Sequence, residues 1–153
     1  MKWETKDIDT YLRAKEYVDT AVIPLVSIVW GDEMKSTVAM GEFISVITEQ
    51  LERQFQGRIV LLPPFTYTNA ESTTERIKRL KNWHDLLVNG GFRHVILLTS
   101  DVTWKESEQQ LEGTLIWMPT IPLEHLDNDI KHDVITEQIK QLIPILTNKW
   151  QNV

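Results

Sequence analysis

Four short apolar runs alternate with longer amphipathic segments, and this alternation constrains the fold more than any other feature of the chain. The runs are rich in leucine and β-branched residues and carry no polar alternation, which is typical of strands that helices cover on both faces. They occupy residues 21–30, 58–62, 94–99 and 114–118. The sequence therefore predicts an α/β fold.

The amphipathic segments predict helices. Residues 36–56 place apolar side chains at helical spacing, and Gly57 follows as a stop signal. Residues 72–75 (Ser-Thr-Thr-Glu) form a capping-box pattern that opens another helix, and residues 89–91 (Asn-Gly-Gly) end it. The other predicted helices cover residues 7–18, 103–110 and 129–150.

Prolines mark two places where regular structure is expected to be interrupted. Pro63 and Pro64 lack a backbone N–H and restrict the residues before them, so residues 65–71 are predicted to form a loop. Pro144 is expected to kink the last helix or to break it into two pieces.

Helical crossovers of a dozen residues or more join the predicted strands, which favours a parallel sheet with right-handed connections. The expected architecture is a three-layer α/β/α sandwich around a mainly parallel sheet of four to five strands. Residues 1–153 contain no internal repeat, low-complexity tract or linker, so a single domain is expected.

Composition narrows the classes of function. The formal net charge of −6 argues against nucleic-acid binding, because phosphate contacts need a clustered basic surface. No apolar run approaches the roughly 20 residues that span a bilayer. Charges near the start of the chain argue against a signal peptide, so a cytoplasmic location is expected. The absence of cysteine excludes disulfides and thiolate ligands.

The first candidate site follows the first predicted strand, at the edge where parallel sheets bind ligands. Trp30 offers an aromatic plate, Gly31 a flexible turn, and Asp32 and Glu33 two carboxylates for a small cationic or hydroxyl-rich ligand or a metal. The alternative interpretation is a turn followed by acids at a helix N-terminus, where negative charge is mildly stabilising.

The second candidate site follows the third predicted strand. Thr99, Ser100 and Asp101 place two hydroxyls and a carboxylate at the strand end, as in the floor of a polar pocket. Ser100 lacks the Gly-x-Ser-x-Gly elbow of a hydrolase nucleophile. Alternatively, Asp101 caps the short helix that follows.

No cofactor and no metal are predicted. The chain has neither a Gly-x-Gly-x-x-Gly nor a P-loop pattern. His125, Asp129 and His132 share one helical face by spacing, but they are interpreted as a solvated polar face. His84 is expected on a helix surface and His94 at the start of a strand.

Three segments carry a resemblance to known proteins. Residues 23–25 (Ile-Pro-Leu), 62–67 (Leu-Pro-Pro-Phe-Thr-Tyr) and 90–96 (Gly-Gly-Phe-Arg-His-Val-Ile) occur in this order. Over residues 20–101 the framework resembles creatininase-like amidohydrolases. The whole chain also resembles the YpiF-like family of uncharacterised bacterial proteins, and that resemblance implies no particular activity.

The creatininase-like resemblance implies metal ligands in two places: a Glu-x-His pair after the first strand and a His-Gly-Gly-Asn segment after the third. Residues 29–32 here read Val-Trp-Gly-Asp and residues 99–102 read Thr-Ser-Asp-Val, so neither place contains histidine. If the fold is shared, the metal site is lost or rebuilt.

Three hypotheses of function remain open. The first is a non-catalytic α/β domain, or one of unknown activity, that binds a small metabolite or a protein partner. The second is a degenerate creatininase-like amidohydrolase with a site built on Asp32, Glu33 and Asp101. The third is a protein-interaction module that uses the loops bearing tryptophan or the terminal helices.

Overall fold

Five strands form the central sheet of the structure, a computed structural model that describes residues 1–152. All of the strand pairings are parallel, as the helical crossovers predicted, and the order across the sheet is β2-β1-β4-β5, with β3 also paired to β1. The strands are β1 (Thr20–Ile28), β2 (Ile59–Leu61), β3 (Phe65–Thr68), β4 (His94–Thr99) and β5 (Thr114–Trp117).

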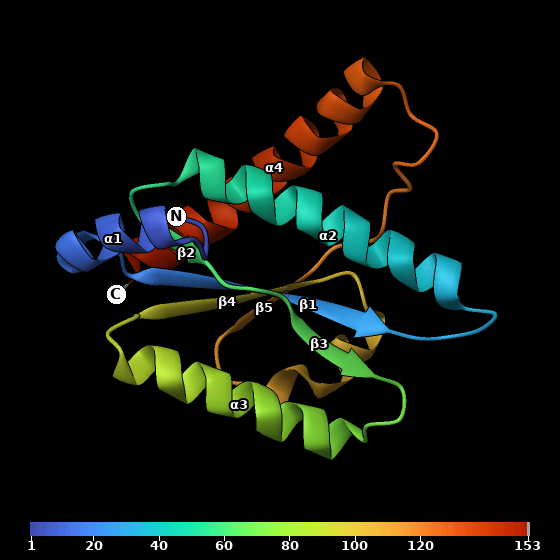
Figure 1. The fold of residues 1–153 in the computed structure, drawn as a ribbon, viewed down its shortest axis with the longest axis horizontal. Coiled ribbons are helices and arrows are strands. Elements are labelled where there is room, and N and C mark those ends of the chain that lie inside the picture. Colours follow the sequence, from blue (N-terminus) through green and yellow to red (C-terminus); the bar gives the residue numbers. More distant parts are fainter. Residues whose placement is uncertain (153) are drawn as a thin grey trace.

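Helices cover both faces of this sheet (Figure 1). On one face lie α2 (Met34–Gln54) and α4 (Asn128–Gln151), and on the other lies α3 (Thr73–Asn89), followed by the 3₁₀ helix η2 (Val102–Gln110). The short elements α1 (Thr5–Arg13) and η1 (Lys15–Tyr17) lie at the amino end of the sheet. The predicted α/β architecture with three layers is confirmed.

The strands divide their side chains between two hydrophobic cores. In β1, Ala21, Ile23 and Leu25 belong to the core under α3, whereas Val22 belongs to the core under α2 and α4. Successive side chains of a strand point to opposite faces, so two covered faces require an unbroken apolar run. The strands of this sheet are therefore apolar at successive positions because each of their two faces is covered by helices.

The prediction of a loop over residues 65–71 is wrong at its start. Phe65 pairs with Leu25 and Thr68 with Ile28, so β3 runs beside the carboxyl half of β1. Proline and the residue before it both favour extended backbone, so the two prolines interrupt the strand without turning the chain away. As a result, β2 and β3 form one interrupted edge strand.

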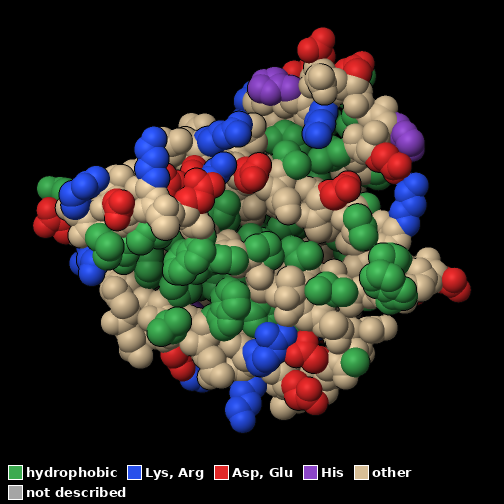
Figure 2. Space-filling model, viewed as in Figure 1, with side chains coloured by type: hydrophobic (Ala, Val, Ile, Leu, Met, Phe, Trp, Pro, Cys, Tyr) green, Lys and Arg blue, Asp and Glu red, His purple; other side chains and the backbone are tan. Residues whose placement is uncertain are grey.

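The outer side of this edge strand is blocked against addition of a further strand. The Met1 amino group donates to the Ile59 carbonyl at 2.6 Å, and the Met1 carbonyl accepts from the Leu61 N–H at 2.8 Å. Beside β3, the Arg79 guanidinium donates to the Thr66 carbonyl at 2.8 Å. Figure 2 shows hydrophobic side chains in a band across this face. A partner would therefore meet side chains here rather than free backbone groups.

Several helix boundaries differ from the predictions. The helix predicted over residues 7–18 ends at Arg13, and the tighter turn of η1 follows. The last helix continues through Pro144 without a break. At α3 the predicted helix start is confirmed, because the Ser72 hydroxyl accepts a hydrogen bond from the Glu75 N–H at 3.1 Å and so caps the helix.

Candidate functional site

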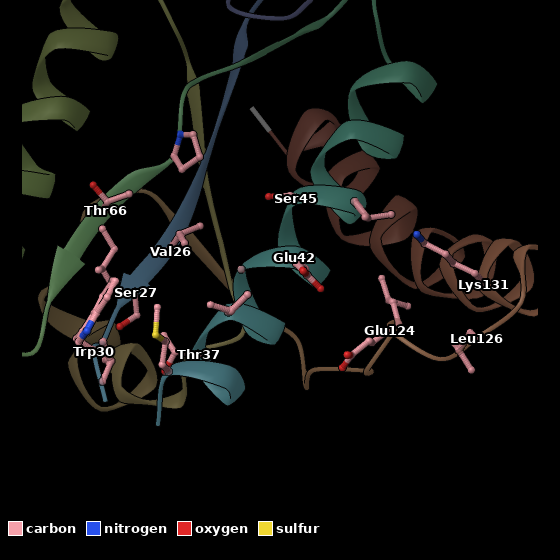
Figure 3. A pocket seen from close by; sticks show the side chains of 18 of the residues that line it. Val26, Ser27, Trp30, Thr37, Glu42, Ser45, Thr66, Glu124, Leu126 and Lys131 are labelled. Carbon is pink, nitrogen blue, oxygen red and sulfur yellow. The ribbon is translucent and has the colours of Figure 1, made fainter. Parts of the chain in front are cut away.

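An open groove of about 840 Å³ lies on the α2 side of the sheet, at the carboxyl end of β1 and β3 (Figure 3). We call it the α2 groove. Its walls come from β1, β3, α2 and the segment that leads into α4. The lining residues are Val26, Ser27, Ile28, Val29, Trp30, Met34, Thr37, Val38, Gly41, Glu42, Ser45, Val46, Pro64, Thr66, Leu123, Glu124, Leu126, Asn128 and Lys131.

The sheet forms the floor of the groove because α2 leaves part of this face uncovered. Val26 and Ile28 of β1 and Thr66 of β3 line the groove, and Ile28 is 48% exposed although it belongs to a strand with a buried first half. At Gly41 the helix lies close to β1, because an added Cβ would lie 3.1 Å from Val26 Cγ1. A side chain at this position would therefore press against the groove wall at Val26.

Trp30 stands at the mouth of the groove, two residues after the end of β1. Its side chain is 82% exposed, and Figure 3 shows it beside Ser27, on the same side of α2 as Thr66. The chain then turns at Gly31, whose φ of 103° lies in the region that glycine adopts readily. The turn fixes the position of the indole relative to the start of α2.

A second part of the groove lies on the other side of α2. In Figure 3, Glu124, Leu126 and Lys131 are separated from Trp30 by the α2 ribbon. Glu124 forms an ion pair with Lys35 at 3.2 Å, and both side chains are mostly exposed. The groove therefore extends from the sheet along α2 to the segment that leads into α4.

Of the first predicted site, the structure brings only Trp30 into the groove. Asp32 and Glu33 are exposed, and Glu33 is the residue before α2, without a side-chain capping bond. Its carbonyl accepts hydrogen bonds from the hydroxyls of Ser36 at 3.0 Å and Thr37 at 2.9 Å. Glu33 thus contributes its backbone, rather than its carboxylate, to the start of the helix.

The second predicted site lies on the opposite face of the sheet and is largely enclosed. Thr99 is fully buried, and its hydroxyl accepts from the Asp101 N–H at 3.0 Å. The Asp101 carboxylate accepts from the N–H and the hydroxyl of Thr103, at 3.0 and 2.8 Å, and so caps η2. Ser100 is buried, and its backbone carbonyl accepts from Trp117 Nε1 at 3.2 Å.

A polar network that the sequence did not predict surrounds Asp101. The Tyr67 hydroxyl donates to the Asp101 carboxylate at 2.6 Å and accepts from Trp104 Nε1 at 2.7 Å. The Arg76 guanidinium lies 4.1 Å from the centre of the Trp104 ring. Burial, and then the neighbouring Asp101 carboxylate, raise the pKa of Tyr67 above its ordinary value. We call Tyr67, Arg76, Asp101 and Trp104 the η2 lock.

The η2 lock occupies the place where doubly wound sheets bind ligands. The strands β2 and β3 lie on one side of β1, whereas β4 and β5 lie on the other. The direction of winding reverses between β1 and β4, so the crevice lies beyond the carboxyl ends of these two strands. The Trp104 side chain is 0% exposed and contacts Phe65 and Tyr67 edge to face. The protein's own side chains therefore fill this region. Of this network, the sequence indicated only that Asp101 caps the short helix after β4.

The acids at the strand ends do not form a cluster suited to a metal ion. Among residues 1–152, one group of three His, Asp or Glu side chains has all its ligand atoms within 4.8 Å of one another, and it lies elsewhere. Asp32, Glu33 and Asp101 are therefore not brought together in this way. The group consists of His84, Asp85 and Glu112.

A family model described as "Protein of unknown function (DUF2487)" matches residues 9–150. The chain belongs to this family. The protein of Bacillus subtilis (strain 168) named "Uncharacterized protein YpiF" is 39% identical over 153 residues, which cover 100% of each chain. The Bacillus relative confirms the resemblance of the whole chain to the YpiF-like proteins, and the DUF2487 description assigns no activity.

No solved structure matches this DUF2487 protein. The resemblance to creatininase-like amidohydrolases is not confirmed by the family or by the Bacillus relative. Within the part of the chain that the structure describes, no helix is both long enough and apolar enough to cross a membrane.

Proposed function

We propose that this protein is a non-catalytic binding domain, and that its ligand is a small, largely apolar molecule held in the α2 groove. The observation that carries the proposal is the groove itself. Its volume of about 840 Å³ falls within the range of roughly 300–1,000 Å³ that is usual for small-molecule sites. An aromatic side chain, Trp30, stands exposed at its mouth.

The lining favours an apolar ligand with a few hydrogen-bonding groups. Val26 and Ile28 on the sheet and Val38 on α2 offer apolar surface, and Val38 is 49% exposed. Covering such surface stabilises a complex by about 25 cal/mol per Å². Hydroxyls at the same walls, those of Ser45 and Thr66, supply the polar contacts that orient a ligand.

Binding is proposed in preference to catalysis because of how the acidic groups of this region are placed. Catalysis needs a nucleophile, acid or base held against a partner group. Glu42 lies on α2, whereas Glu124 lies on the segment beyond it and pairs with Lys35. Asp101, which follows β4 and lies on the opposite face of the sheet, accepts three hydrogen bonds from Tyr67 and Thr103.

A ligand screen with two matched variants tests the proposal. Melting temperatures are measured across a panel of metabolites for the wild type, for Val38→Trp and for Val102→Trp. Both valines are about half exposed, but only Val38 lines the groove. Compounds that raise the melting temperature of the wild type are expected to lose their effect on Val38→Trp and to keep it on Val102→Trp. Equal shifts in both variants would place the ligand elsewhere.

A second candidate function is self-association through the apolar band beside β2. Trp3 and Leu86 are 58% and 73% exposed and flank a hollow of about 210 Å³. Two-fold pairing of one patch with its copy is the commonest way to cover such a surface. Sedimentation equilibrium of the wild type and of Leu86→Lys tests this candidate, with a dimer expected only for the wild type.

The remaining expectations from the sequence stay proposals. We propose a cytoplasmic location and no binding to nucleic acid, and the net charge of −6 supports the second point. Fractionation of cells and a DNA-binding titration at low salt test the two expectations separately.

A further inference from the structure

A cluster of titratable side chains lies far from the α2 groove, between α3 and the turn before β5. His84 and Asp85 belong to the second half of α3, and Glu112 lies two residues before β5. Their ligand atoms are mutually within 4.8 Å. The proposed function makes no use of this cluster, so its role is a separate question.

The two distances from His84 to the carboxylates of the cluster fall near those between neighbouring ligands of a metal ion. His84 Nδ1 lies 3.1 Å from a Glu112 carboxylate oxygen and 3.3 Å from an Asp85 carboxylate oxygen. Neighbouring ligands that bind one ion at about 2.0–2.2 Å are separated by roughly 2.8–3.1 Å in octahedral geometry and by roughly 3.3–3.6 Å in tetrahedral geometry. The imidazole nitrogen therefore lies at a suitable distance from each carboxylate to share an ion with it, and all three atoms lie within 4.8 Å of one another.

The backbone before β5 holds Glu112 in this position. Gly113 has a φ of +91°, and a Cβ added to it would lie 2.9 Å from the Val95 carbonyl oxygen and 3.5 Å from His84 Cδ2. A residue with a side chain would be strained there and would push the turn away from β4 and His84. The close approach of Glu112 to α3 therefore depends on glycine.

A positive charge already lies between the two carboxylates. Lys81 Nζ is 2.9 Å from Asp85 and 3.7 Å from Glu112. The cluster thus attracts cations, and Lys81 competes for the same position that a metal ion would take.

We propose that His84, Asp85 and Glu112 form a binding site for a divalent transition-metal ion. One imidazole and two carboxylates suit Zn²⁺ or Mn²⁺ better than Mg²⁺ or Ca²⁺, which prefer oxygen ligands alone. Three protein ligands leave further positions for water. The half-exposed carboxylates of Asp85 and Glu112 give the ion access from solvent. A bound ion would tie α3 to the turn before β5.

Titration of the chelator-treated full chain with Zn²⁺ tests the proposal. Calorimetry is expected to give one ion per chain, and the melting temperature is expected to rise by about 5–10 °C at a hundredfold excess over Kd. Glu112→Gln and His84→Gln are expected to abolish both effects. Glu112 is half-exposed in a turn, so its variant tests binding with little risk to folding.

Two further variants separate this site from other zinc binding by surface histidines. Lys81→Met is expected to bind Zn²⁺ about tenfold more tightly, because a competing positive charge is removed. The double variant His125→Gln/His132→Gln, which changes two histidines outside the cluster, is expected to bind like the wild type. Binding that persists in Glu112→Gln, binding lost in the double variant, or no binding by the wild type would each overturn the proposal.

Discussion

The two faces of the β1–β3 pair differ sharply at the carboxyl end of the sheet. On the α3 face, Phe65 and Tyr67 are almost fully buried beneath α3 and η2. On the α2 face, Thr66 and Thr68 of the same strand are exposed, and the sheet forms the floor of an open groove. Four consecutive residues therefore serve two different environments, because side chains alternate along a strand.

This difference indicates where a ligand is expected to bind. The crevice that doubly wound sheets ordinarily use is filled by Trp104, which the hydroxyl of Tyr67 and the guanidinium of Arg76 hold in place. Over residues 1–152 the α2 face stays open as a groove, and the exposed aromatic side chain Trp30 lines it. One face of the sheet end is therefore closed by packed side chains, and the other is open to solvent.

The largest expected effect is the loss of the indole that fills the crevice. Trp104→Ala is expected to lower the free energy of unfolding by about 3–5 kcal/mol, because a fully buried aromatic side chain is removed and a cavity remains. Urea denaturation measures the change. Trp3→Ala, at a side chain 58% exposed, serves as the control and is expected to cost much less. Similar losses for both variants would contradict the comparison.

Next in size is the effect of removing the carboxylate that organises the η2 lock. Asp101→Ala is expected to cost about 2–3 kcal/mol, because it removes the cap of η2, the acceptor of the Tyr67 hydroxyl and the ion-pair partner of Arg76. Asp32→Ala, at an exposed turn, is expected to change stability by less than about 0.5 kcal/mol. Denaturant titration of both variants checks the contrast, and equal costs would refute it.

A smaller effect is expected at alkaline pH. The pKa of Tyr67 is raised in the folded state, so the folded protein retains a proton that the unfolded chain releases above about pH 10. The contribution of Tyr67 to the free energy of unfolding is fully present below pH 10. It is lost as pH rises above that value, by about 1.4 kcal/mol per pH unit.

Denaturation of the wild type and of Tyr67→Phe between pH 9 and 11 measures this dependence. The wild type is expected to lose stability more steeply than the variant, which has no phenol to ionise at this position. Tyr17→Phe, at a side chain 70% exposed, is the matched control and is expected to follow the wild type. If the stability of the wild type and of Tyr67→Phe fell equally with pH, the pKa of Tyr67 would not be raised in the folded state.

The smallest expected effect on stability is on the open face. Trp30→Ala is expected to change the free energy of unfolding by less than about 0.5 kcal/mol, because the indole is mostly in solvent. The same variant is expected to lose ligand-induced shifts in melting temperature if the proposed function holds. A loss of several kcal/mol would instead assign Trp30 to the fold.

Much of the fold followed from local patterns, and the errors have physical causes. Residues 65–68 alternate buried and exposed positions, as an edge strand does, but the two preceding prolines suggested a loop. Trp104 lies in a 3₁₀ helix, whose period differs from that of an α-helix, so helical periodicity did not mark it as a core residue.

The candidate sites were less predictable than the fold. Trp30 was named from the sequence because it ends a strand, and the structure places it on the groove. The other groove walls belong to α2 and to the segment before α4, and their meeting depends on how α2 crosses the sheet. His84 was interpreted as an ordinary surface histidine because Glu112, its neighbour in space, is distant in the sequence.

The sequence by itself determined the parallel layered architecture and the start of α3, because hydrophobic period and capping are properties of neighbouring residues. The tertiary structure alone decided which strand-end residues are available. Asp101 and Trp30 follow neighbouring strands, yet one is enclosed by Tyr67 and the other faces solvent. That outcome depends on groups that distant segments bring to each face of the sheet, and local patterns do not encode their meeting.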